Sequence, residues 1–305
     1  MSNSDTADDL QRFLTDVDRK FYAEFDPFYF WTLAECLNKA TPSSLRIQDI
    51  DSGEVLGEHS VLDGLKISRE RYEEYAIHTI RALRYFSSET LVLFILCGSD
   101  FGPFARIAST MRERALAQVY RALKDEKVPE GFEVVIGGQP LAFNEWLSYQ
   151  LFADPRQLEA VTQGEIKRLV VEEADLLSER GAINAFKHGK PTYFGPGVAL
   201  KVKDETGEFS PLNEVVSGLN WVDWYESKGR DFSVAFGTEE LNSEQDMKRL
   251  MAVSLLLHSI CLVRGAVSRG EAQVDVHLPN NFETGLSVKR QKFKFSFKQK
   301  GVPVK

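Results

Sequence analysis

The sequence predicts a mainly α protein, a helical bundle with minor β elements, and three observations lead to that class. Long segments carry apolar residues at helical spacing, segments rich in β-formers are short, and neither a fixed-period repeat nor a Pro/Ser-rich linker divides the chain. With 305 residues, 43% of them hydrophobic, the chain can bury a large core. We expect a helical bundle domain over residues 1–271 with short β insertions around 192–237, and a basic C-terminal β appendage over 272–305.

The predicted helices begin near the N-terminus. An apolar rhythm over residues 9–37 is interrupted at Asp26-Pro27, which predicts two helices or one helix broken by the proline. Ser68 is a typical N-cap for a helix that keeps one face apolar to Phe86 and then becomes apolar on all sides as far as Cys97. Further helices are predicted over residues 104–124, 164–188 and 243–264.

The predicted strands are short and several stand beside glycine turns. They cover residues 132–136, 197–202, 232–236, 272–278 and the alternating segment 292–298. Trp221 and Trp224 are three residues apart, a spacing more typical of one edge of a packed helix than of a base-stacking surface.

Several classes of protein are disfavoured by composition and motif. The three cysteines lack a C-x-x-C spacing, the histidines lack metal-ligand spacing, and no phosphate-binding or dinucleotide glycine loop is present. The first nine residues are polar and acidic, and the longest apolar run, 250–263, is shorter than the roughly 20 residues that span a bilayer. We therefore expect a cytoplasmic protein that needs no membrane, metal or cofactor.

Charge is unevenly distributed along the chain. The total of 37 basic and 45 acidic residues gives −8, but residues 284–305 hold seven basic and no acidic residues, so they carry +7 and the remainder −15. Within this tail, Lys292, Lys294 and Lys298 alternate with phenylalanines, as in a strand with one apolar face. These lysines either protect the solvent face of a terminal strand or bind RNA.

The strongest candidate site lies in the helix predicted over residues 164–188. Helical spacing places a set of polar residues on one stripe of that helix: Glu173, Arg180, Asn184, Lys187 and His188. Gly189 and Pro191 would end the helix, so His188 falls in its last turn, where the helix dipole favours the imidazolium. The catalytic candidates are Arg180, Asn184, Lys187 and His188. The alternative is structural, with an Arg–Glu pair and a cation that stabilise the helix.

The segment Asn184-Ala185-Phe186-Lys187-His188-Gly189, late in a helix that follows two long helices, resembles the HEPN-like superfamily of helical bundles over roughly residues 68–190. Nuclease members of that superfamily carry Arg, a polar residue that is often Asn, three others and then His. Asn184 and His188 match this pattern, whereas Ile183 stands at the Arg position.

The resemblance implies metal-independent RNA cleavage at a composite site between the two bundles of a homodimer, in a bacterial stress or phage-defence response. With Ile183 in the motif, Arg180 or Lys187 would have to supply the cation that stabilises the developing phosphorane charge. The alternative is a catalytically inactive HEPN-like scaffold that binds a protein partner. The residues leave both alternatives open, and they name neither the substrate nor the trigger.

Overall fold

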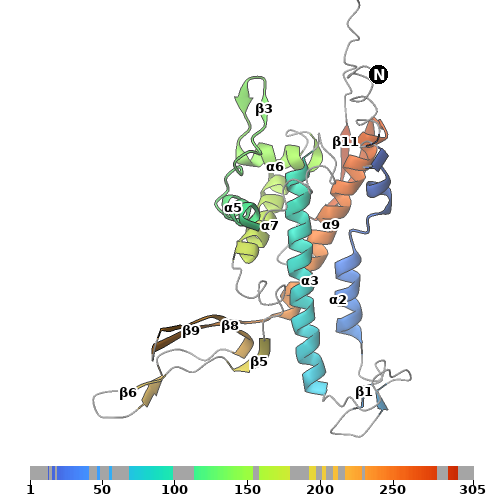
Figure 1. Cartoon of the computed structure of the whole chain (residues 1–305). Coiled ribbons are helices and arrows are strands. Elements are labelled where there is room, and N and C mark those ends of the chain that lie inside the picture. Colours follow the sequence, from blue (N-terminus) through green and yellow to red (C-terminus); the bar gives the residue numbers. More distant parts are fainter. Residues whose placement is uncertain are drawn as a thin grey trace, which may run out of the picture. The chain divides into compact units, whose positions relative to one another are not determined.

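The described part of the chain is mainly helical, with a few short antiparallel strands (Figure 1). This confirms the predicted fold class, a mainly α helical bundle with minor β elements. The computed structural model describes residues 13, 16, 17, 19–40, 47–48, 55–56, 69–98, 113–153, 158–178, 192–196, 201–203, 209–211, 217–228, 231–279 and 288–294.

Contacts divide the chain into two compact units. Unit 1 comprises Met1–Phe30, Phe86–Ser178 and Lys248–Lys305, and unit 2 comprises Trp31–Tyr85 and Glu179–Met247. Three helices contribute residues to both units: α2 (Tyr29–Lys39), α3 (Arg69–Cys97) and α9 (Ser243–Ser268).

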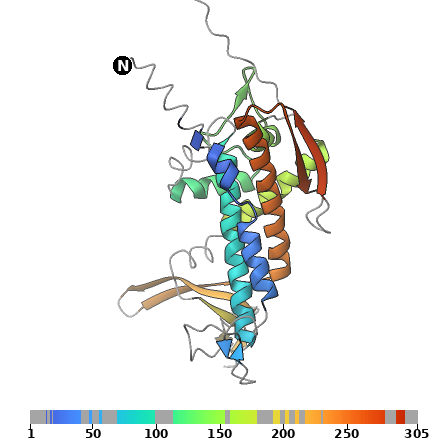
Figure 2. The ribbon, with the colours of Figure 1, turned by 90° about the vertical axis from the view of Figure 1, so that its right-hand side faces the viewer.

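Unit 1 is built from the second half of α3 and most of α9, together with α5 (Glu113–Lys124), α6 (Phe143–Phe152) and α7 (Ala160–Ser178). The second half of α3 lies beside α9 in both views of the ribbon (Figure 1, Figure 2). The core consists of large apolar side chains that are almost fully buried, among them Phe94, Ile95, Leu123, Trp146, Phe152, Leu169 and Leu256. Each such side chain contributes about 1.5–3 kcal/mol by leaving water.

The predicted break at Asp26-Pro27 is confirmed. Residues 19–24 are helical, the chain turns at Pro27, and α2 begins at Tyr29. The Asp26 carboxylate accepts a hydrogen bond from the Phe28 backbone N–H at 2.9 Å, which supplies a side-chain cap just before the new helix. Only four residues, 25–28, therefore separate the end of one helix from the start of the next.

In unit 1, one arginine side chain forms hydrogen bonds with the C-terminal ends of two helices. Arg264 of α9 is 5% exposed, and its Nη2 donates to the backbone carbonyls of Phe94 at 2.7 Å and Gln150 at 2.6 Å. These carbonyls belong to the last turns of α3 and α6, where helix geometry leaves C=O groups without intrahelical partners. The guanidinium also matches the negative ends of both helix dipoles.

A β-hairpin precedes α6. Its strands are β3 (Val135–Ile136) and β4 (Gln139–Pro140), and the turn between them holds Gly137 and Gly138 at φ +61° and +83°. Two consecutive left-handed residues make a type I′ turn, for which glycine is favoured. The hairpin base is tied to α6, because the Trp146 indole Nε1 donates to the Phe132 carbonyl at 2.7 Å.

Unit 2 holds the three-stranded antiparallel sheet β5-β8-β9, made of β5 (Thr192–Pro196), β8 (Ser217–Lys228) and β9 (Asp231–Glu239). Two smaller antiparallel pairs join β1 (Ile47–Gln48) to β2 (Val55–Leu56) and β6 (Lys201–Lys203) to β7 (Phe209–Pro211). Gly218 permits a close approach of strands, since a Cβ there would lie 2.1 Å from the Glu239 carbonyl oxygen.

The interpretation of Trp221 and Trp224 as one helical edge was wrong, because both belong to β8. The register shifts between Val222 and Trp224, so that Val222 pairs with Phe236 and Trp224 with Ala235. The bulge adds one residue to the strand, and the two tryptophans therefore count as only two positions apart along the ladder. Because of this bulge, two strand residues have the sequence spacing of three that is typical of neighbours on a helix.

The predicted strands 272–278 and 232–236 are confirmed as β10 (Gln273–Pro279) and as the centre of β9. The tail strand is β11 (Val288–Lys294), which pairs with β10 and begins four residues before the predicted start. Residues 295–298 of the predicted strand lie outside the described residues.

Among the described helices, α9 alone is long and apolar enough to cross a membrane by length and composition. In the fold, 72% of the most apolar 18-residue stretch of this helix is buried. The helix also carries buried charged groups with protein partners, Asp246 and Arg264. Burial of this kind is what the core helix of a folded domain shows.

Candidate functional site

The predicted catalytic residues Arg180, Asn184, Lys187 and His188 lie outside the described residues, as does Ile183. The helix predicted over residues 164–188 is present as α7, which is described as far as Ser178. Of the predicted RNA-binding lysines, Lys292 pairs with Asp275 and Lys294 with Gln273 in the backbone register of β11 with β10, and Lys298 is not described.

The described helix that leads in sequence to the predicted site is α7. Its apolar residues Ile166, Leu169, Val170, Ala174 and Leu177 are buried. Three acidic residues in its second half each join a different helix of unit 1: Glu172 pairs with Arg249 of α9, Glu173 with Ser88 of α3, and Asp175 with Lys124 of α5. Contacts to three neighbouring helices fix the rotation of α7 about its axis.

Glu173 is the most deeply buried of the three acidic residues. Its side chain is fully buried, and Oε2 accepts a hydrogen bond from the Ser88 hydroxyl at 2.6 Å. A charged carboxylate in such a place must be hydrogen-bonded, since an unpaired buried charge is strongly unfavourable. Helical spacing predicted Glu173 on the polar stripe with Arg180, but it could not predict the contact of Glu173 with Ser88 of α3.

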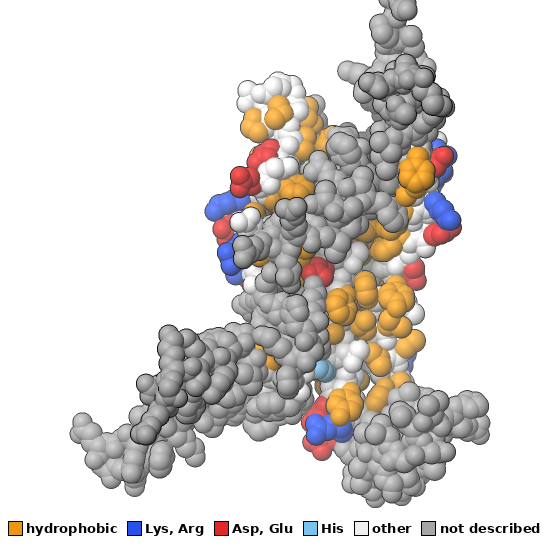
Figure 3. All heavy atoms as spheres, in the orientation of Figure 1, with side chains coloured by type: hydrophobic (Ala, Val, Ile, Leu, Met, Phe, Trp, Pro, Cys, Tyr) orange, Lys and Arg blue, Asp and Glu red, His pale blue; other side chains and the backbone are white. Residues whose placement is uncertain are grey.

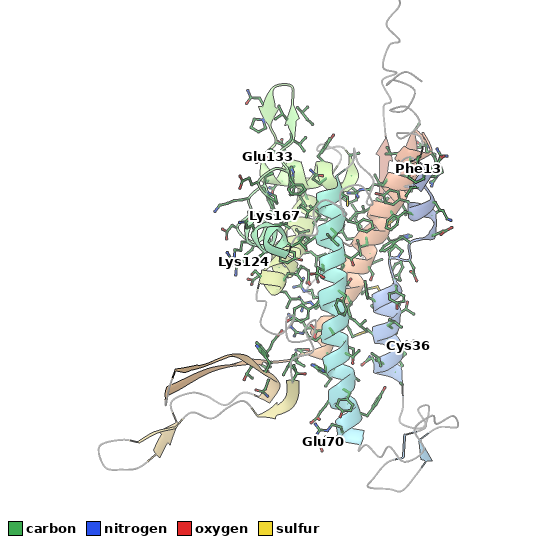
Figure 4. The ribbon with its side chains drawn as sticks, in the orientation of Figure 1. Phe13, Cys36, Glu70, Lys124, Glu133 and Lys167 are labelled. Atoms are coloured by element: carbon green, nitrogen blue, oxygen red, sulfur yellow. The ribbon has the colours of Figure 1, made fainter. Side chains whose placement is uncertain are left out.

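The other two acidic residues make more exposed ion pairs. The Asp175 carboxylate is 48% exposed and its partner Lys124 is 44% exposed. Lys124 is labelled in Figure 4. Next to them, Lys167 Nζ lies 2.9 Å from Glu126 Oε2, which makes a second link between α7 and the loop after α5. Ion pairs at such exposure contribute little stability, so these pairs set the position of α7 more than its stability.

Unit 2 contains a second polar cluster, which sequence analysis missed. Arg81 Nε donates to Asp246 Oδ2 at 2.9 Å and Arg84 Nη1 donates to Asp246 Oδ1 at 3.0 Å. Arg81 Nη1 also donates to Glu239 Oε1 at 2.5 Å, and the Tyr85 hydroxyl donates to Glu239 Oε2 at 2.7 Å. The cluster joins α3, the end of β9 and the first turn of α9.

The chemistry of this cluster is that of a balanced structural network. Two guanidinium groups face two carboxylates, so no excess charge is left to attract an anionic substrate. Burial, followed by the negative charge of Glu239, raises the pKa of Tyr85 far above its ordinary value, and the phenol stays protonated as a donor. The sequence signal was the spacing of Arg81, Arg84 and Tyr85, which places three polar side chains on one face of the helix.

Metal and thiol chemistry have little support among the described residues. No group of three or more His, Cys, Asp or Glu side chains is arranged there to hold a metal ion. Cys36 is exposed, Cys97 and Cys261 are buried, and each is a thiol that is not part of a disulfide. Burial raises the pKa of the Cys261 thiol to about 12, which keeps it protonated and unreactive.

No family model, curated protein or solved structure matches the chain.

Proposed function

We propose that the chain is a HEPN-like helical protein that acts on RNA in a bacterial stress or phage-defence response, by metal-independent endonucleolytic cleavage. The observation that carries the proposal is the helix α7. It is held by ion pairs and hydrogen bonds to three neighbouring helices, and it directly precedes in sequence the segment that holds Arg180, Asn184, Lys187 and His188. In the proposal, a helix held in this way would support an acid–base group that follows it in the chain.

The proposed chemistry assigns one role to each residue. His188 exchanges a proton with the reacting phosphodiester as a general acid or base, since imidazole titrates near neutral pH. Arg180 or Lys187 stabilises the negative charge of the phosphorane, in place of the arginine that Ile183 replaces in the motif. Asn184 lies one helical turn from both Arg180 and His188 in sequence and would orient either of them.

The dimer and the tail belong to the same proposal. One His and one Arg make a poor catalytic set by themselves, so two copies would have to contribute to a shared site. Lys292, Lys294 and Lys298 would bind the RNA backbone through its phosphates. A cytoplasmic location is proposed with this function.

The second candidate is a catalytically inactive HEPN-like scaffold that binds a protein partner. Ile183 favours it, because the arginine of the nuclease motif is absent at that position. The cluster around Asp246 favours it as well, since its side chains satisfy one another and serve the fold.

The decisive experiment incubates the purified full chain with total RNA in the presence of EDTA. We expect cleavage by the wild type and none by His188→Ala, with the melting temperature of the variant within a few degrees of the wild type, since a last-turn histidine contributes only about 0.3–2 kcal/mol. Gln118→Ala, at an exposed position on α5, is the matched control and should cleave normally.

The possible results separate the two candidates. Full cleavage by His188→Ala would exclude His188 from catalysis. An inactive wild type that retains a protein partner from its own cells would favour the scaffold. Light scattering at micromolar concentration tests the dimer, and a monomer would contradict the composite site.

A further inference from the structure

The β3–β4 hairpin exposes apolar side chains at its tip. Val135 is 62% exposed and Ile136 is 41% exposed, although both lie in a regular strand. Hydrophobic side chains are visible on the hairpin at the surface, with acidic side chains at its base (Figure 3), where Glu133 is labelled in Figure 4. An ordered apolar strand left in water is typical of a surface that binds another chain.

Within the described part of the chain, no strand other than β4 pairs with β3, so its outer edge is available to a further strand. Val135 is paired with Pro140, and the adjacent pair is joined by a hydrogen bond from Leu141 N–H to the Val134 carbonyl at 2.9 Å. Because hydrogen bonds in an antiparallel ladder occur at alternate pairs, the backbone N–H and C=O of Val135 point away from β4. The edge of β4 is poorer, since Pro140 has no N–H to donate.

The charge around the hairpin indicates which kind of strand could pair with the outer edge of β3. Residues 125–145 contain five acidic residues and one basic residue. Glu130, Glu133 and Glu145 are exposed and form no ion pair within the described part of the chain. A second copy of the same hairpin, an RNA or an anionic membrane would all be repelled, and an extended basic segment with alternating apolar residues would be attracted.

A segment of that chemistry directly follows β11 in the sequence. Residues 295–300 read Phe-Ser-Phe-Lys-Gln-Lys, with no acidic residue, and they follow Lys294, the last residue of β11 in unit 1. The hairpin belongs to unit 1 as well.

We propose that the occupant of the open β3 edge is this C-terminal segment, residues 295–300. In antiparallel register, Ser296 would pair with Val135 through the free backbone groups of that edge. The same register sets Phe295 opposite Ile136, Phe297 opposite Val134 and Lys298 opposite Glu133. Apolar side chains then meet apolar side chains on one face, and opposite charges meet on the other. The inference does not depend on RNA, although it gives Lys298 a second binding partner.

The test places the photo-crosslinking residue benzoylphenylalanine at Ile136 in the full chain and maps the products by mass spectrometry. We expect cross-links to residues 295–300. The matched control carries the same residue at Val161, an apolar position of unit 1 that is 72% exposed, and should not cross-link to that segment. Isotope-labelled mixtures show whether the segment comes from the same molecule or a second copy, and either result supports the docking.

A charge exchange tests the register. Glu133→Lys should lower the yield of the cross-link at least tenfold, and adding Lys298→Glu should restore it. The proposal is overturned if the cross-links fall elsewhere, if none form, if the Val161 control reaches the same segment, or if the charge exchange leaves the yield unchanged. Each of these results is independent of RNA cleavage, so failure here leaves the proposed function standing.

Discussion

The Ser88 hydroxyl donates a hydrogen bond to the Glu173 carboxylate at 2.6 Å, and through this contact α3 holds the most buried acidic residue of α7. Ser88 and its neighbour Ser87 are both buried, yet only Ser88 forms this bond, and the Ser87 hydroxyl has no hydrogen-bond partner among the described residues. The two serines therefore form a natural pair of test and control positions.

Ser88→Ala should destabilise the protein by about 1–3 kcal/mol, because it removes a hydrogen-bond donor from a buried carboxylate. Ser87→Ala should be neutral or slightly stabilising, since it removes a buried hydroxyl that forms no hydrogen bond. Urea denaturation followed by circular dichroism measures both free energies of unfolding. Equal effects of the two variants would show that the Ser88–Glu173 bond contributes nothing specific.

Asp246→Asn should be more damaging, with a loss of about 3–5 kcal/mol, because two buried arginines lose the charge of their common partner. Asp175→Asn makes the same chemical change in a half-exposed pair and should cost less than about 1 kcal/mol. Thermal and denaturant unfolding compare the two variants. A stable Asp246→Asn protein would show that the arginines have other sufficient partners.

The thiols should differ sharply in reactivity. At pH 8 we expect dithiobis(nitrobenzoate) to label Cys36 rapidly and the two buried cysteines only after denaturation, with the single variant Cys36→Ser unlabelled in the native state. Rapid labelling of two or three thiols in the native protein would contradict the burial.

Alkaline pH provides a second readout at Cys261. Its pKa is raised in the folded protein from an ordinary 9.0 to about 12, so the folded state keeps the proton that the unfolded state releases. The resulting stability is fully present below pH 9 and is lost progressively as the pH rises toward 12. The free energy of unfolding should consequently fall more steeply over this range for the wild type than for Cys261→Ala.

If the tail binds RNA as proposed, replacing Lys292, Lys294 and Lys298 with Gln should weaken that binding in a salt-dependent way. Each lost phosphate contact should reduce the slope of log affinity against log salt by roughly 0.7 for a single strand. The control replaces three exposed lysines elsewhere, Lys20, Lys39 and Lys127, with the same change in net charge. If both triple variants bind RNA with the wild-type slope, the tail lysines do not contact phosphate.

The long helices were predictable because their signals are local. Ser68 precedes α3, which runs from Arg69 to Cys97, and α9 begins at the predicted Ser243. The helix α6 was not predicted, since its N-cap is Ala142, which forms no side-chain hydrogen bond, and the segment just before it has the glycines of a turn. Without a capping side chain, the start of a ten-residue helix leaves little trace in the sequence.

The polar clusters were harder to predict than the helices. Asp246 lies more than 160 residues from both arginines that it binds, and no spacing rule connects groups so far apart. Helical periodicity could indicate that Glu173 faces inward, but only tertiary packing identifies Ser88 as its partner.

The contact of Arg264 with the last turns of α3 and α6 should also couple the motions of these helix ends. Because one guanidinium holds the carbonyls of Phe94 and Gln150, transient opening at either end loosens the hold on the other. Hydrogen exchange of the backbone amides at the two ends should therefore be correlated, although the helices are separate in sequence. The side chain of a third helix would thus link the local opening of two others.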